Sequence, residues 1–236
     1  SFAKLVNIKV PSNDRIEPNC AVCKRCGGCA FRHISYDAEL KLKQNTVKQT
    51  FARIAKMDIR VNETVFDDDE RYRNKVQYPF AKGESGAVFG YYARHSHRII
   101  AHSDCPLQDK IFTDIADYTA KTADKLSIPA YDEESGSGIL RHAVMRKNRN
   151  GRILYCLVVA KKHKNLSLLA ETVAMRFNEI IGIHVNVNTR RDNVIFGDET
   201  YRLLGEETLT DTLCGKAFEL SPRAFYQVNA VMAEKL

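Results

Sequence analysis

The sequence predicts an α+β fold in which antiparallel β-hairpins form a sheet and helices cover one side of it. Residues 72–101 contain short runs rich in Val, Tyr, Phe and Ile between turn residues, a pattern typical of antiparallel strands. Asn150 and Gly151 separate two apolar runs, and an Asn-Gly pair in that position is a strong hairpin signal. Amphipathic segments begin after Ser35 and after Asn165, where apolar residues recur at helical spacing.

The N-terminal part of the chain is predicted to hold one strand and one helix. Residues 1–10 alternate like a strand and run into a Pro-Ser-Asn-Asp turn cluster, so this strand needs a partner. Ser35 can cap a helix that runs to about Lys56. Residues 67–70 form a short acidic linker. The helix carries an apolar stripe that must be buried against another surface. Its members are Tyr36, Leu40, Val47, Phe51 and Ile54.

The remainder of the chain alternates strands with two further helices. Strands are expected over residues 72–80 and 88–100, followed by a helix over 108–125. The helix that begins after Asn165 is expected to stop at Gly182, because glycine commonly ends helices. A further strand, IHVNVNTR, follows it.

Composition is that of an ordinary globular protein. The chain has 236 residues, 44% of them hydrophobic, which is enough for one large or two modest cores. Its 36 Lys and Arg against 29 Asp and Glu give a net charge of +7, which permits a polyanionic partner but equally describes a plain basic protein. The longest apolar run, residues 153–160, is too short to span a bilayer, and the first residues show no leader pattern. We therefore expect a cytoplasmic protein with no membrane partner.

Four of the seven cysteines fall within residues 20–29, which read CAVCKRCGGC. A disulfide framework would spread an even number of cysteines along a short secreted chain. Ligation of a metal or cluster in a reducing compartment is therefore the better interpretation. Iron–sulfur clusters take closely spaced cysteines plus a remote one followed by proline, and Cys105 precedes Pro106. Structural zinc prefers two separated C-x2-C pairs. The residues favour a cluster over zinc or free thiols and leave five candidates for four positions.

Arg71, Arg73 and Lys75 alternate along a predicted strand, so their side chains should point to one face. Such a row can contact RNA phosphates and would make binding salt-dependent. A solvated strand face explains the same residues equally well.

Other candidate sites are better explained as structure. The SGSG stretch at 135–138 follows no strand and opens no helix, so we expect a turn rather than a nucleotide-binding loop. Cys156 lies inside an apolar run and is expected to be a buried strand residue. His95 and His97 share one face of a predicted strand, and we expect surface or phosphate contacts rather than metal ligation.

Four motifs spread along the chain form a common pattern. The spacing C-x5-CGGC-x3-H-x2-Y, with a helix rich in Leu, Lys and Gln behind it, covers residues 20–43. The others are RYRNKVQYPF at 71–80, GYYARHSHRIIAHSDCPLQ at 90–108 and LSPRAFYQVNA at 220–230. Together they resemble the iron–sulfur-containing RNA uracil-5-methyltransferases of the 23S ribosomal RNA type, and the last motif resembles the family's SPRxFxQVN signature.

The resemblance implies a particular ligand set. The family's C-x5-C-x2-C triplet and remote Cys-Pro match Cys20, Cys26, Cys29 and Cys105, which would then hold a 4Fe-4S cluster. Cys23 is an additional cysteine outside the family pattern.

The resemblance also implies methyl transfer from S-adenosyl-L-methionine to C5 of uridine. In the family a cysteine adds to C6 of a flipped-out uracil before C5 takes the methyl group. The cofactor loop, the nucleophile and the base are expected beyond Leu236, so this chain should hold no catalytic residue and be inactive alone. Phe225 would stack near the target base and Gln227 would contact the methyl donor. The implied partner is RNA, with large-subunit ribosomal RNA preferred because transfer-RNA relatives mostly lack the cluster.

The resemblance divides the chain into parts of a three-domain protein. If the methyltransferase domain is incomplete here, the helix at 35–57 should pair with a second copy of the chain or lack a fixed position. The expected divisions are 1–10 as the last strand of an OB-like (TRAM) RNA-binding domain, 11–34 as the iron–sulfur loop, 35–64 as a helix packing on the methyltransferase domain, 65–219 as the central α+β domain and 220–236 as the start of the cofactor-binding domain.

Two other classes of function compete with this interpretation. One is an RNA-binding module, stabilised by zinc or a cluster, without catalysis. The other is an electron-transfer iron–sulfur protein, which would usually be small and acidic, whereas this chain is basic. Visible absorbance separates a cluster from zinc.

Overall fold

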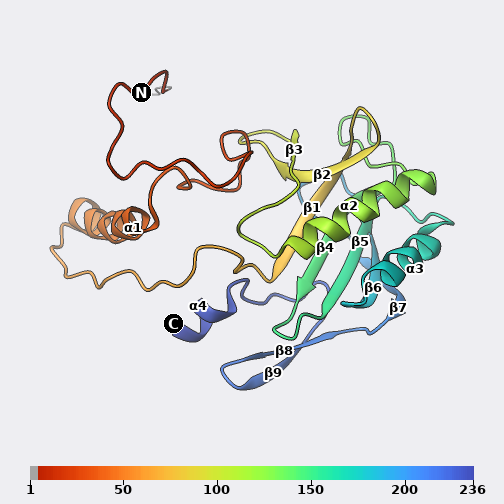
Figure 1. Cartoon of the computed structure of the whole chain (residues 1–236). Coiled ribbons are helices and arrows are strands. Elements are labelled where there is room, and N and C mark those ends of the chain that lie inside the picture. Colours follow the sequence, from red (N-terminus) through yellow and green to blue (C-terminus); the bar gives the residue numbers. More distant parts are fainter. Residues whose placement is uncertain (1–4) are drawn as a thin grey trace.

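The computed structural model describes residues 5–236 and shows the predicted α+β architecture (Figure 1). The helical elements are α1 (Tyr36–Thr50), a π-helical turn η1 (Phe51–Ala55), α2 (Lys110–Lys125), α3 (Leu166–Arg176) and α4 (Ala230–Lys235). The strands are β1 (Lys75–Lys82), β2 (Ala87–Tyr92), β3 (Ile99–Ala101), β4 (Leu140–Lys147), β5 (Ile153–Val159), β6 (Ile180–Val187), β7 (Glu199–Gly205), β8 (Leu209–Leu213) and β9 (Lys216–Leu220).

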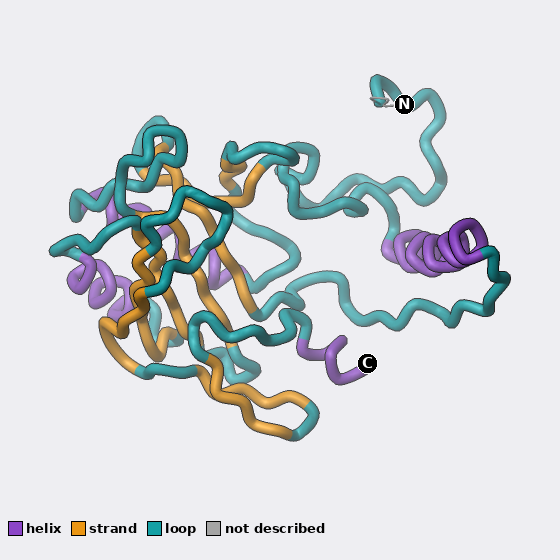
Figure 2. The backbone as a smooth tube through the Cα atoms, turned by 180° about the vertical axis from the view of Figure 1, so that it is seen from behind, coloured by secondary structure: helices purple, strands orange, loops and turns teal. Residues whose placement is uncertain are grey.

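Seven strands form one sheet in the order β3-β2-β1-β4-β5-β6-β7, and β8 and β9 form a separate hairpin. Neighbours in the sheet are antiparallel except β5 and β6, which run parallel and are connected through α3. Both α2 and α3 pack on the same face of the sheet and against each other (Figure 1). The opposite face is covered by loops instead of helices (Figure 2).

The core lies between the sheet and the two helices. Tyr78 from β1, Phe112 from α2 and Tyr155 from β5 are fully buried there. Successive strand residues point to opposite faces, so Cys156 lies on the other side, packed with Val144, and is 1% exposed. Burial raises the pKa of its thiol to about 12, which confirms the expectation of an inert buried residue.

The predicted β4–β5 hairpin is confirmed. Gly151 adopts a φ of +79° in its turn, a conformation that favours glycine. The side-chain oxygen of Asn148 accepts hydrogen bonds from the backbone N–H groups of Asn150 (3.0 Å) and Arg152 (2.8 Å).

The helix that follows Asn165 is shorter than expected, because α3 ends at Arg176 and β6 begins at Ile180. Gly182 therefore lies inside a strand and does not end the helix. A Cβ atom at this position would collide with the carbonyl oxygen of Glu206, so the glycine marks a close approach of two backbones.

The strand expected over residues 88–100 is interrupted. Strand β2 ends at Tyr92, and His95 has a φ of +54° in the turn before β3. His95 and His97 consequently do not share a strand face. The SGSG stretch forms a turn as expected, with positive φ at Gly136 and Gly138.

Residues 5–10 and helix α1 stand apart from the sheet (Figures 1 and 2). Residues 5–10 form no strand, and residues 1–4 of the expected strand lie outside the described residues. Ser35 caps α1 as predicted, its hydroxyl oxygen accepting from the N–H of Ala38. No residue of α1 is buried, and Ile54 is 79% exposed. Thus Val47, Phe51 and Ile54 of the apolar stripe are exposed, whereas Tyr36 and Leu40 are half-buried beside residues 61–66, with Tyr36 in edge contact with Phe66.

Within residues 5–236, every helix is too short or too polar to pass through a lipid bilayer.

Candidate functional site

The five cysteines predicted as ligand candidates line one cavity of about 160 Å³. Cys20, Cys23, Cys26 and Cys29 come from the N-terminal loop, and Cys105 comes from the segment between β3 and α2. The fold thus gathers residues that are far apart in the sequence, and it places Cys23 beside the four expected ligands.

The cysteine loop is fastened to the chain at the end of β2. The N–H of Gly27 donates to the carbonyl oxygen of Tyr92 at 2.9 Å, and Arg94 Nη2 donates to the carbonyl oxygen of Cys29 at 2.7 Å. A Cβ at residue 27 would lie only 2.9 Å from the Tyr92 oxygen. Glycine therefore permits the loop to dock this closely.

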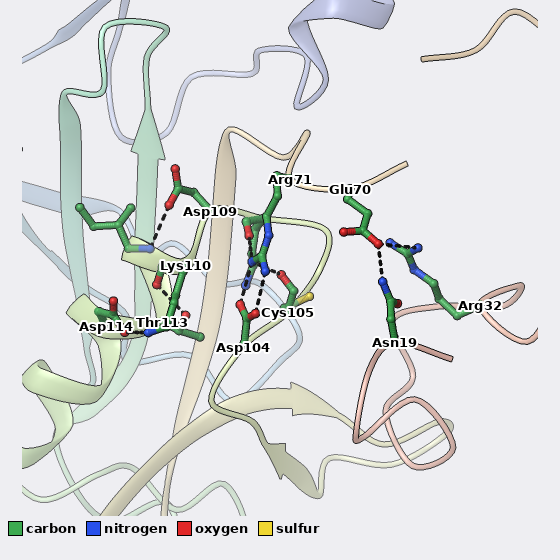
Figure 3. Close-up of polar contacts among 12 residues, drawn as sticks. Asn19, Arg32, Glu70, Arg71, Asp104, Cys105, Asp109, Lys110, Thr113 and Asp114 are labelled. Atoms are coloured by element: carbon green, nitrogen blue, oxygen red, sulfur yellow. Dashed lines mark hydrogen bonds and ion pairs between the residues drawn. The ribbon is translucent and has the colours of Figure 1, made fainter. Parts of the chain in front are cut away.

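Arg71 holds the segment that carries the remote cysteine (Figure 3). Its Nη1 donates to Asp104 Oδ1 at 2.7 Å and to the carbonyl oxygens of Cys105 (3.1 Å) and Gln108 (2.7 Å). Its backbone N–H donates to the carbonyl oxygen of Pro106 at 2.7 Å. The hydrogen bonds to Asp104 raise the pKa of Arg71 and lower that of the carboxyl group.

The basic row expected on one strand face is not formed. Strand β1 begins only at Lys75, and Arg71 has a φ of +51°, outside the extended region. Arg73 lines the cysteine cavity, whereas Lys75 pairs in register with Arg146 of β4. The physical reason is that residues 71–74 bond to segments distant in the sequence instead of continuing the strand.

Two polar groups in the wall of the cysteine cavity have no partner in the described structure. Arg73 Nε and His102 Nε2 are buried without a hydrogen bond. The His102 ring stacks on Tyr91 at a centroid distance of 5.4 Å. Burial lowers the pKa of His102, so the ring is neutral near pH 7.

The thiols themselves lie in an environment that disfavours free thiolates. Burial raises the pKa of Cys23, Cys29 and Cys105, and the neighbouring sulfurs act in the same direction. Several thiolates can occupy this cavity only if positive charge compensates them. Among residues 5–236, no three His, Cys, Asp or Glu side chains are grouped closely enough to hold a metal ion.

A second feature lies beside the N-terminal end of β1, where residues 221–229 pass the ends of β1 and β4. The N–H and side-chain amide of Asn74 donate to the carbonyl oxygens of Val228 and Gln227, both at 2.9 Å. Arg146 Nη2 donates to the carbonyl oxygen of Ala224 at 2.7 Å, and its guanidinium lies 5.6 Å from the Tyr226 ring centroid.

Anchoring of this segment leaves Phe225 projecting into solvent. Tyr226 is only 8% exposed, whereas Phe225 is 86% exposed. The side chain of Gln227 is also exposed, whereas its backbone carbonyl oxygen accepts a hydrogen bond from Asn74. Nearby, Lys75 is half-buried, and burial together with the charge of Arg146 lowers its pKa.

Residues 71–75 connect the two features. Arg71 and Arg73 contact or line the cysteine cavity, and Asn74 and Lys75 lie at the segment that presents Phe225.

Against descriptions of known protein families, the chain matches none. Curated relatives named uncharacterized RNA methyltransferases are similar to nearly the whole chain. They include proteins of Listeria innocua (37% identical, covering 100% of this chain and 52% of the relative), Halalkalibacterium halodurans (38%, 97% and 51%) and Clostridium acetobutylicum (37%, 100% and 53%).

Among solved structures, the chain is similar to a Pyrococcus abyssi tRNA (uracil-54, C5)-methyltransferase in complex with S-adenosyl-L-homocysteine. The match has a TM-score of 0.71 at 19% identity and covers 95% of this chain and 50% of that one. The likeness establishes a shared fold. The chain spans about half the length of the curated relatives it matches.

Sequence reasoning missed several residues of these sites. Asn74 and Arg146 anchor the Phe225 segment, yet both are polar residues in or next to a strand with no motif of their own. His97 bonds to Glu133, a partner that no motif in the sequence indicates. Only the long-range pairing, which the sequence does not display, identifies these roles.

Proposed function

We propose that the chain is part of an S-adenosyl-L-methionine-dependent RNA methyltransferase that methylates C5 of uridine. The observation that carries the proposal is the similarity of essentially the whole chain to proteins named RNA methyltransferases. The fold likeness to a uracil-C5 methyltransferase bound to S-adenosyl-L-homocysteine supports it, because that molecule is what remains of the donor after methyl transfer.

We further propose that Cys20, Cys26, Cys29 and Cys105 hold a 4Fe-4S cluster. The donor set fits, since thiolate ligands are those that such clusters use. The unpartnered Arg73 Nε–H in the cavity wall and the Gly28 N–H, 3.4 Å from Cys26 Sγ, suit the bridging and ligand sulfurs. The iron would supply the positive charge that the crowded thiolates require. The cluster would then join the N-terminal loop to the sheet domain.

The proposed RNA surface is the edge formed by Lys75 and the exposed ring of Phe225. Lys75 provides a charge for a phosphate, and the ring provides a face on which a base can stack. Gln227 is proposed to contact the methyl donor and the target base. Arg71 and Arg73 support this surface by holding residues 71–75 in place.

The domain divisions follow from this proposal. Residues 11–34 would form the cluster loop, 65–219 the central domain and 220–236 the approach to the cofactor-binding domain, with 1–10 belonging to an OB-like domain. Helix α1, within 35–64, would pack on the methyltransferase domain. The chain alone, without the expected nucleophile and cofactor loop, would transfer no methyl group. The preferred substrate is large-subunit ribosomal RNA.

Mapping of 5-methyluridine by mass spectrometry of RNA from cells with and without the gene tests this function. We expect one ribosomal uridine to lose its methyl group in the deletion strain and regain it on complementation. An unchanged set of methylated uridines in both ribosomal and transfer RNA would refute the proposal, and a loss confined to transfer RNA would refute the ribosomal substrate alone.

A further inference from the structure

A further cavity, lined by several polar side chains, lies on the sheet face that carries no helix. It has a volume of about 380 Å³ and lies between the end of β2, the start of β4 and the loop that follows β6. We call it the β2–β4 cavity. Gln77 and His142 line it, whereas their neighbours Tyr78 and Ala143 belong to the core under the helices. It is therefore separated from that core by the sheet itself.

A β-bulge directs two successive polar residues of β4 into this cavity. The register between β4 and β5 shifts between Leu140 and His142, so Arg141 is an extra residue in the ladder. Bulges of this kind re-aim side chains, and both Arg141 and His142 line the cavity.

Each of these two residues has a buried polar atom without a partner. Arg141 is 4% exposed and His142 is 6% exposed, and Arg141 Nε and His142 Nδ1 make no hydrogen bond within the described structure. Leaving buried polar groups unpaired is costly. A ligand that reaches both atoms would recover that cost.

The guanidinium of Arg141 is held rigidly in place. Its Nη1 donates to the carbonyl oxygens of Asn188 (2.8 Å) and Arg190 (2.6 Å), and the group lies 4.6 Å from the Tyr131 ring centroid. The free Nε is thus oriented before any ligand arrives, which reduces the entropy lost on binding.

Two aromatic rings stand at the rim of the cavity. Tyr92 and His97 lie 5.4 Å apart between ring centroids, and both bond to the same carboxylate, that of Glu133. Burial acts to raise the pKa of Glu133, but the hydrogen bonds from His97 and Tyr92 outweigh it and lower that pKa. The ionised carboxylate therefore keeps both rings in position.

The cavity carries charges of both signs, which disfavours simple ions. Glu133 and Asp192 both line it and would repel a phosphate, whereas Arg141 would repel a metal cation. Burial lowers the pKa of His142 to about 4, so its ring offers one donor and one acceptor near pH 7. The ligand that fits is neutral, planar and able to donate and accept hydrogen bonds along one edge.

We propose that the β2–β4 cavity binds one unpaired nucleobase of the RNA substrate, with Tyr92 and His97 at its face and Arg141 and His142 at its edge. Stacking on aromatic rings combined with edge hydrogen bonds is how proteins read single-stranded RNA. The inference rests on the proposed function, which supplies the RNA.

Strand β1 connects the cavity with the segment that presents Phe225, because Asn74, next to the start of β1, bonds to the carbonyl oxygens of Gln227 and Val228. Lys75 and Gln77 lie on the same side of β1, and the row continues to Pro79 at the cavity. Four residues of strand span roughly 13 Å. One RNA strand can therefore place a base in the cavity and another near Phe225.

Photocrosslinking of the 236-residue chain tests the proposal. The probe is a short single-stranded oligouridine that carries 4-thiouridine, irradiated with near-ultraviolet light, followed by trypsin digestion and mass spectrometry. We expect crosslinks in two peptides, residues 83–94 with Tyr92 and residues 224–235 with Phe225. The second peptide serves as an internal control.

Three variants connect the first crosslink to the cavity. His142→Leu, which keeps a similar volume, should abolish the crosslink in 83–94, weaken binding about tenfold and leave the crosslink in 224–235. Tyr92→Leu should weaken binding similarly, whereas Tyr92→Phe should retain both. His163→Leu, a histidine outside both sites, should change nothing.

The outcomes separate this inference from the proposed function. A crosslink in 224–235 without one in 83–94, or a crosslink in 83–94 that survives His142→Leu, would overturn the cavity as a base site and leave the proposed function standing. Absence of RNA binding altogether, together with unchanged RNA methylation in the deletion strain, would refute both the cavity as a base site and the proposed function.

Discussion

Arg71 and Asp104 form a two-bond ion pair in which Nη1 lies 2.7 Å from Oδ1 and Nη2 lies 2.7 Å from Oδ2. The pair is substantially exposed, so its charge attraction alone contributes little to stability. Its importance is positional, because the same guanidinium also binds the carbonyl oxygens of Cys105 and Gln108.

Arg71→Lys should loosen the turn that carries Cys105, since lysine cannot reproduce the two-pronged contact. We expect the free energy of unfolding to fall by about 1–3 kcal/mol and the iron content per chain to fall with it. Urea unfolding and iron analysis after anaerobic purification measure both. Arg53→Lys, on the exposed turn η1, is the matched control. Equal iron content in both variants would contradict the positional role.

The proposed ligand set predicts different results for five serine variants. Cys20→Ser, Cys26→Ser, Cys29→Ser and Cys105→Ser should each lose most of the iron and acid-labile sulfide and the brown absorbance, whereas Cys23→Ser should keep them. Full iron content in Cys105→Ser would sink this assignment. Loss in Cys23→Ser would indicate that the compact loop supplies the ligands. Zinc in place of iron would favour a zinc-stabilised RNA-binding module.

Phe225→Ala should weaken RNA binding without changing stability. The ring is 86% exposed, so its removal uncovers little buried surface, whereas loss of base stacking costs about 1–3 kcal/mol per base. Fluorescence anisotropy with labelled oligouridine measures the binding, and thermal unfolding measures the stability. Phe225→Tyr should bind as the original chain does. A variant that binds RNA normally would show that the exposed ring has another purpose.

Stability should depend on pH through His142. Burial and the charge of Arg141 lower its pKa to about 4, although Glu133 opposes this, whereas the unfolded value is about 6.5. The unfolded chain therefore binds more protons between these values, and the contribution of roughly 3 kcal/mol is complete above pH 6.5 and lost as pH falls toward 4. His142→Leu should flatten this part of the curve in urea unfolding. An unchanged slope would contradict the assigned neutral state.

Helix α1 should mediate association of the isolated chain. Val47, Phe51 and Ile54 of its apolar stripe are exposed, and large apolar side chains in water favour pairing with a similar face. Light scattering should show a concentration-dependent dimer that the double change Leu40→Glu, Phe51→Glu abolishes. Lys41→Glu with Lys48→Glu, on exposed positions of the same helix, should leave it intact. If the chain is a monomer and α1 is strongly protected in hydrogen exchange, the sheet domain itself covers this face.

The elements with local signals were predictable from the sequence. Gly151 takes the positive φ of the β4–β5 turn, and Ser35 caps α1 through a contact with Ala38. The grouping of the cysteines was predictable too, because the spacing of the four N-terminal cysteines and the remote Cys-Pro pair are both visible in the sequence.

The parts that escaped prediction depend on contacts between distant segments. Arg71 leaves the extended region because Asp104 and the carbonyl oxygens near it hold its side chain. Gly182 was predicted to end a helix, but it lies in a strand where the carbonyl oxygen of Glu206 leaves no room for a side chain. Arg141 and His142 turn to one cavity only because β4 bulges against β5.

The order of strands in the sheet has a consequence for how the chain assembles. β4 and β5 form a hairpin, so they can pair with little loop entropy to overcome, whereas β6 joins β5 through the α3 crossover. The cysteine cavity needs the N-terminal loop to meet Cys105 across β1, β2 and β3. We therefore expect the cysteines to remain reduced and accessible until the sheet has folded. Oxygen should then damage newly made chains more than folded ones.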